Sequence, residues 1–114
     1  MENLITTFDS EASAMADIEA AGFHSITMEF AAGENEPHWH DFDAFVFVLE
    51  GELVLTDVES GESRVCGPGT KVQAARGVLH RESTPGYKAL IGFSQPLDDL
   101  TQPIDKPPPV QLPA

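Results

Sequence analysis

Apolar and polar residues follow a helical period near the start of the chain. Asp9 or Ser10 can cap a helix at its N-terminus, and Gly22 is suited to end it after Ala21. The apolar side of this helix is expected to carry Ala12, Met15 and Ile18, with Ala16 and Ala20 beside them. The pattern therefore predicts one short N-terminal helix over about residues 10–21.

From Phe23 onward the period changes to two. Ile26, Met28 and Phe30 alternate with polar residues, which is typical of a half-buried strand, and His24 shares their parity. Residues 44–49 form an unbroken apolar run, which Glu50-Gly51 separates from a second strand-like segment over 52–56. Two such segments joined by two residues with Gly in second place predict a β-hairpin, in which Ala44 would face Asp57.

Further turns are marked by segments that contain Gly or Pro. They lie at 59–62, 67–69, 76–77 and 85–86, with short strand-like segments between them. About eight short strands at this spacing predict an all-β fold, a small antiparallel β-barrel or sandwich. Because the run at 44–49 is apolar on both faces, it needs a second sheet inside and another element or a second subunit outside. We expect a symmetric homodimer.

The C-terminal segment differs in composition from the rest of the chain. Six prolines lie between Gln95 and Ala114, including three in succession at 107–109. Such a segment cannot join a central strand and is expected to be extended or polyproline-like, lying against the barrel or a neighbouring subunit. The chain is thus divided into one domain over 1–94, which includes the helix, and an extended Pro-rich tail over 95–114.

Composition narrows the function classes. A chain of 114 residues is one domain's worth, and 19 acidic against six basic residues give a formal charge of −13. This charge repels phosphate backbones and anionic lipids, so nucleic-acid and membrane binding are not expected. Cys66 is the only cysteine, which excludes an internal disulfide and fits a reducing compartment. With no leader-like N-terminus and no apolar run of membrane length, we expect a cytoplasmic protein.

Three histidines suggest a metal site. His38 and His40 are two apart on an extended segment, so both point to one face, roughly 6–7 Å apart at the backbone. Both imidazoles can then reach one divalent ion, although a surface His-x-His in a loop fits the two residues equally well. His80 follows a turn that leads into a strand.

At this point the chain resembles the cupins, and among them the small single-domain type-2 cupins, which are small antiparallel β-barrels or jelly rolls with two motifs. The first motif matches Gly33, a spacer, His38-Trp39-His40 and Gly51. The second matches Gly67-Pro68-Gly69 and residues 75–80. The resemblance implies that His38, His40 and His80 bind a divalent transition metal such as Fe, Zn, Mn or Ni.

This chain also departs from the cupin pattern. The position of the family's glutamate ligand falls on Ala44, the spacer after Gly33 is one residue short, and Ala75 and Thr84 replace the usual Pro and Asn. Three neutral imidazoles would leave the ion's charge available to an anionic or chelating substrate.

Other carboxylates could fill the place of the missing glutamate. Asp43 is a possible fourth ligand if a bulge turns it inward, and Asp57 is a weaker candidate. Glu82 shares the inward parity of His80 and could accept a hydrogen bond from a ligand or act as a general base. We expect the pocket to be lined by His24, Met28, Ala44 and Val46, whereas Cys66 is read as a small buried apolar residue.

Three functions fit these residues. The first is a metal-dependent enzyme acting on a small chelating molecule, in the manner of the cupin dioxygenases that the histidines resemble, or an isomerase or hydrolase. The second is a non-catalytic cupin that binds or senses a small molecule, which the missing glutamate favours. The third is a metal-free structural barrel.

Overall fold

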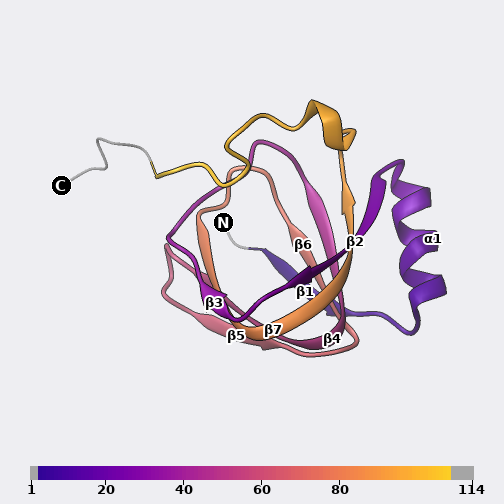
Figure 1. Ribbon diagram of the computed structural model, residues 1–114, viewed down its shortest axis with the longest axis horizontal. Coiled ribbons are helices and arrows are strands. Elements are labelled where there is room, and N and C mark those ends of the chain that lie inside the picture. Colours follow the sequence, from indigo (N-terminus) through magenta and orange to yellow (C-terminus); the bar gives the residue numbers. More distant parts are fainter. Residues whose placement is uncertain (1–2, 109–114) are drawn as a thin grey trace.

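The computed structural model describes residues 3–108, which form one antiparallel sheet with one α-helix (Figure 1). Its elements are β1 (Leu4–Thr7), α1 (Glu11–Ala21), β2 (His24–Phe30), β3 (Gly33–Glu34), β4 (Ala44–Asp57), β5 (Ser63–Cys66), β6 (Thr70–Ala74), β7 (His80–Phe93) and a 3-10 helix at Leu97–Asp99. The sheet order is β1-β6-β4-β7-β2, with β3 on β7 and β5 on β4. The predicted antiparallel all-β fold with a short N-terminal helix is confirmed.

Helix α1 begins and ends where the sequence predicts. The Ser10 hydroxyl accepts from the Ser13 amide at 3.0 Å, the Ser13 hydroxyl accepts in return from the Ser10 amide, and Gly22 ends the helix with φ 72°. The predicted apolar side is wrong in part, because Ala14 and Ile18 are the buried residues. Ala12, Ala16 and Ala20 are exposed, and Met15 is half-buried. Residues four apart share a helix face, and the small Ala14 lets the helix approach the sheet closely.

Strands β4 and β7 are each continuous, so the predicted hairpin at Glu50-Gly51 and the predicted turn at 85–86 are wrong. The two strands pair along almost their whole length, with irregularities between Val48 and Glu50 and between Glu52 and Val54. Gly51 has φ 76°, and Glu52 pairs with Gly86. A glycine at positive φ can form a bulge as well as a turn, and here it bends both strands at the same height and curls the sheet.

The sheet has an apolar cluster on each face. The interior cluster is made of Phe42, Ala44, Val48, Leu53, Leu55, Cys66, Val72, Tyr87, Ala89, Ile91, Phe93 and Leu100. On the outer face, Phe47 and Leu90 pack against Ala14 and Ile18 of α1, and Figure 1 shows the helix lying outside the sheet. The run at 44–49 is therefore covered on its outer side by α1. The argument for a homodimer from an uncovered outer face of this run is therefore removed, and the homodimer stays a prediction.

Residues 100–108, named the C-terminal strap, cross one end of the curled sheet (Figure 1). Leu100 is buried in the interior cluster, and Lys106 pairs with Trp39 through two backbone hydrogen bonds of 2.9 and 3.1 Å. The rest of the predicted tail, residues 109–114, lies outside the described residues. Among residues 3–108, no helix is both long and apolar enough to cross a membrane.

Candidate metal centre

Three histidines come together at the end of the sheet that the strap crosses. His38 lies between β3 and β4, and His80 is the first residue of β7. Reciprocal backbone hydrogen bonds of 2.8 and 2.9 Å join His38 to His80. The ring of His40 lies 5.0 Å from each of the other two, and one ring nitrogen from each histidine lies within 4.8 Å of those of the others. The predicted trio thus forms one cluster.

A backbone carbonyl group fixes the orientation of each imidazole. The Nδ1 atoms of His38, His40 and His80 lie 2.8, 2.9 and 2.9 Å from the carbonyl oxygens of Glu36, Ile104 and Val78. A carbonyl oxygen can only accept, so each Nδ1 carries the proton. Each Nε2 then presents a lone pair, which is the form in which histidine binds a transition metal.

Burial disfavours a positive charge on His80. His38 and His80 are each 3% exposed. Burial lowers the pKa of His80 below 6.5, which outweighs the opposing effects of the Val78 carbonyl and the Glu82 carboxylate. Within residues 3–108, Nε2 of His38 is buried without a hydrogen-bond partner. A metal-binding nitrogen has this appearance when no ion is present, because its lone pair is reserved for the metal rather than for a hydrogen-bond donor. The residues therefore fit a divalent transition ion.

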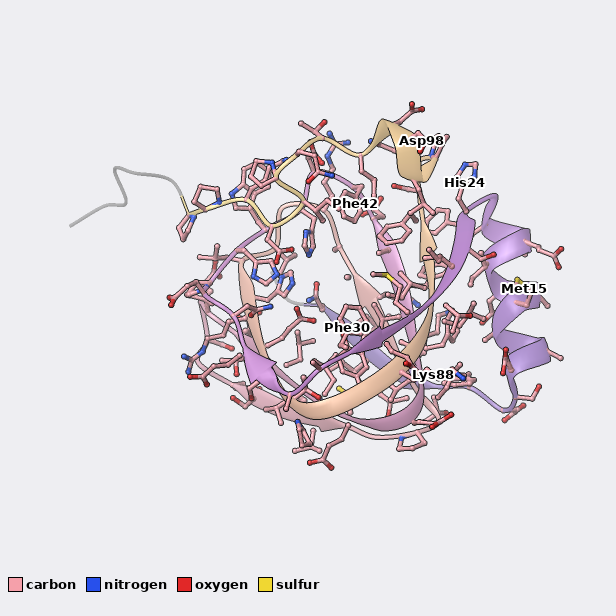
Figure 2. All side chains as sticks on the ribbon, in the orientation of Figure 1. Met15, His24, Phe30, Phe42, Lys88 and Asp98 are labelled. Carbon is pink, nitrogen blue, oxygen red and sulfur yellow. The ribbon has the colours of Figure 1, made fainter. Side chains whose placement is uncertain are left out.

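His40 and His80 border a cavity of about 400 Å³ inside the sheet. Its walls are mainly apolar and include Met28, Phe30, Ala44, Val46, Tyr87 and Phe93, with His40, His80 and Glu82 at the polar end. The predicted lining residues Met28, Ala44 and Val46 are among them. His24 is not: it is exposed, and Figure 2 shows it at the rim of the sheet beside α1. The prediction failed because the first residues of β2 extend past the cavity.

Two predicted carboxylates do not join the cluster. Asp43 is exposed, and its Oδ1 atom accepts a hydrogen bond of 2.8 Å from the backbone amide of Arg76, outside the cavity. Asp57 pairs with His80 rather than with Ala44, and its Oδ1 accepts from the Ser60 amide at 2.8 Å. Asp41 and Phe42 form a bend rather than a regular strand, and the bond to Arg76 holds the Asp43 carboxylate away from the histidines just before β4 begins.

Glu82 does face the histidines. Its Oε1 lies 3.7 Å from Nε2 of His38 and accepts a hydrogen bond of 3.1 Å from the Asn35 amide group. The Glu82 backbone amide donates to Oδ1 of the same Asn35 at 2.7 Å. These two bonds hold the carboxylate at the polar end of the cavity, on the side that its parity with His80 predicts.

Asp105 of the strap is a site residue that sequence reasoning missed. Its Oδ1 lies 3.7 Å from Nε2 of His38 and 3.8 Å from Nδ1 of His40. It stands 25 positions after His80 in a segment without periodic pattern, so no local signal marks it. Tyr87 also lines the cavity and stacks on Phe30 at 4.5 Å, and burial, together with the nearby Glu82 and Asp105 carboxylates, raises the pKa of its hydroxyl.

Solved structures resemble this arrangement in fold. A DUF861 family protein from Thermotoga maritima superposes with a TM-score of 0.63 at 20% identity, covering 79% of this chain and 97% of that one. KdgF from Halomonas sp. superposes with a TM-score of 0.55 at 24% identity, covering 66% of this chain and 71% of that one. The polyketide cyclase RemF from Streptomyces resistomycificus gives 0.53 at 20% identity, covering 82% and 66%.

A family model identifies the chain, whereas the comparison with curated proteins does not. No curated protein matches the chain. The model of the cupin domain matches residues 26–92, a range that contains all three clustered histidines and Glu82. This match covers more than half of the sequence and agrees with the folds of the similar structures. The chain belongs to the cupin domain family.

Proposed function

We propose that this cupin is a metal-dependent enzyme that acts on a small, largely apolar molecule with a chelating polar end. The observation that carries the proposal is the cluster of three histidines, two of which line the polar end of the apolar cavity, with a carboxylate 3.7 Å from the buried Nε2 of His38. A divalent ion held there would supply Lewis-acid or redox chemistry to a substrate bound next to it.

The cavity indicates the class of substrate. A volume of about 400 Å³ fits a small molecule, and the aromatic walls formed by Phe30, Phe42 and Tyr87 favour an apolar body. Polar side chains lie at the histidine end, so the substrate's oxygen or sulfur donors would point there. Diketones, catechols and thiols have this division between an apolar body and a chelating end.

Glu82 is the candidate general base. Asn35 holds its Oε1 beside His38, and a carboxylate in that place can take a proton from a substrate hydroxyl, thiol or activated carbon. Asn35 therefore serves as a positioning residue. Tyr87 keeps its phenolic proton, because burial raises its pKa, and can donate a hydrogen bond to a molecule in the cavity.

The first experiment measures metal content. The chelator-treated full chain is loaded separately with Fe(II), Mn(II), Zn(II) or Ni(II), desalted, and analysed for bound metal. We expect about one equivalent of at least one metal in the wild type, and a loss of binding in His38→Ala and His80→Ala. His24→Ala is the matched control, because His24 is exposed and lies away from the cluster. Equal metal content in wild type and His38→Ala would overturn the proposal.

The second experiment measures turnover. The Fe(II)-loaded protein is supplied with diketones, catechols and thiols under air, and oxygen uptake and products are followed; the other metals are tested for isomerisation or hydrolysis. Glu82→Gln should lower turnover by roughly 10²- to 10⁴-fold while metal content is kept. A Glu82→Gln variant with wild-type turnover would remove Glu82 from the role of base.

A binding or sensing protein is the second candidate. It is favoured by Ala44, which lines the cavity and has no donor atom where the resemblance places a glutamate ligand. In that case a chelating compound would bind the metal-loaded protein tightly and be recovered unchanged after long incubation.

A further inference from the structure

The strap places a carboxylate directly over the histidine cluster. Asp105 lies between two residues that are themselves bound to the histidine segment. On one side, the Ile104 carbonyl oxygen accepts the Nδ1 proton of His40 at 2.9 Å. On the other side, Lys106 pairs with Trp39 through both backbone groups. The backbone of Asp105 is therefore held across His38-Trp39-His40, and its side chain reaches the cluster.

We propose that Asp105 is the acidic fourth ligand of the metal centre, supplied by the C-terminal strap in place of the glutamate that Ala44 cannot provide. This inference rests on the proposed function, because it requires an ion at the three histidines. The distance between Asp105 Oδ1 and His38 Nε2 allows both atoms to bind the same ion. Ligand atoms about 2.1 Å from a metal are separated by roughly 3.0 Å at right angles and 4.2 Å when opposite. The 3.7 Å between Asp105 Oδ1 and His38 Nε2 lies within these limits.

Charge favours the same assignment. Three neutral imidazoles leave both positive charges of a divalent ion uncompensated, and a carboxylate ligand removes one of them. The Asp105 side chain is 56% exposed, so it can turn onto the ion without breaking a packed environment. Glu82 is equally near to His38, but its near oxygen already accepts from Asn35.

The consequence is that the ion ties the strap to the barrel. Ile104 and Asp105 both line the cavity, and Leu100 anchors the start of the strap in the interior cluster. Lys106 further stiffens the strap, since its ammonium group donates to the carbonyl oxygens of Thr101 and Pro103 at 3.1 and 2.8 Å. A bound ion would therefore add one more link between the strap and the barrel on this side of the cavity.

The test compares Zn²⁺ affinity of the wild-type full chain with that of Asp105→Asn, measured by competition with a chelator. Asp98→Asn is the control, because it makes the same change of charge at an exposed position in the 3-10 helix that precedes the strap. We expect Asp105→Asn to weaken Zn²⁺ binding by at least about tenfold. Loss of a group that only hydrogen-bonds to a metal ligand already has an effect of this size. Asp98→Asn should stay within about twofold.

Hydrogen exchange supplies a readout independent of affinity and activity. In the wild type, Zn²⁺ should slow exchange of the Lys106 amide, which donates to Trp39, and Asp105→Asn should abolish that slowing. If the wild type binds no metal, both the proposed function and this inference fall. If it binds Zn²⁺ and Asp105→Asn keeps both the affinity and the slowed exchange, this inference alone is overturned, and Glu82→Gln then tests the other carboxylate.

Discussion

Gly92 is the residue of β7 on which helix α1 rests. A methyl group added there would lie 2.8 Å from Cγ1 and 3.0 Å from Cγ2 of Ile18. Ile18 is 1% exposed and packs with Phe47 and Leu90, so its side chain has no free space to move into. We therefore expect Gly92→Ala to push the helix away from the sheet.

The contacts set the size of the effect. Overpacking costs typically about 1–3 kcal/mol, and contacts at or below 3.0 Å place this case at roughly 2–3 kcal/mol. For a domain of this size that lowers Tm by roughly 8–12 °C. Ile18→Ala alone leaves a cavity and should cost about 2–5 kcal/mol. In the double variant the new methyl group enters the space that Ile18 leaves, so the double variant should be at least about 1 kcal/mol more stable than the sum of the single changes predicts.

Equilibrium denaturation of the wild type and the three variants measures these free energies. Gly67→Ala is the control: a methyl group there meets no heavy atom within 4 Å, and its cost should stay within about 0.5 kcal/mol. All variants should keep the metal content of the wild type, because Gly92 and His80 lie near opposite ends of β7. Wild-type stability of Gly92→Ala, or strict additivity in the double variant, would refute this account of helix packing.

Two further predictions concern the metal and the buried thiol. Zn²⁺ at 100 times its Kd should stabilise the wild type and His24→Ala by about 2.7 kcal/mol in thermal melts, and should not shift His38→Ala; an equal shift in that variant would place the ion elsewhere. Burial raises the pKa of Cys66 above 9.0, so the folded thiol should react with a disulfide reagent far more slowly at pH 8 than the denatured chain. As pH rises, the thiol ionises in the unfolded chain before it ionises in the folded one. The protonated thiol therefore contributes its full stability below pH 9, and this contribution is lost at higher pH. Cys66→Ala should reduce the fall in Tm above pH 9.

The sequence predicts those features of the fold and the site that depend on residues near one another in the chain. Ser10 and Gly22 define α1 because a cap and a left-handed stop act within one helical turn. His38 and His40 converge because alternate residues of an extended segment share a face. Glu82 faces the cluster for the same reason, two positions after His80. Each of these predictions depends on residues close together in the chain.

The sequence does not predict the features that depend on contacts between residues far apart in the chain. The sequence predicts turns at Gly51 and Gly86 because each allows positive φ, yet both lie inside long strands, at the same height of the β4–β7 pair. Asp105 reaches His38 through a strap whose path depends on the pairing of Lys106 with Trp39. Parity predicts His24 in the pocket, but parity does not determine how far a strand extends past the cavity.

Trp39 makes the position of the strap observable by fluorescence. It is the only tryptophan of the chain, it stands between two histidines of the cluster, and its indole N–H donates to the Pro107 carbonyl oxygen at 2.8 Å. Fluorescence from this protein under selective excitation therefore comes from the junction of strap and cluster. Lifting of the strap would break the indole hydrogen bond and expose the ring, so that emission colour and quenching would report its position in real time, without any label.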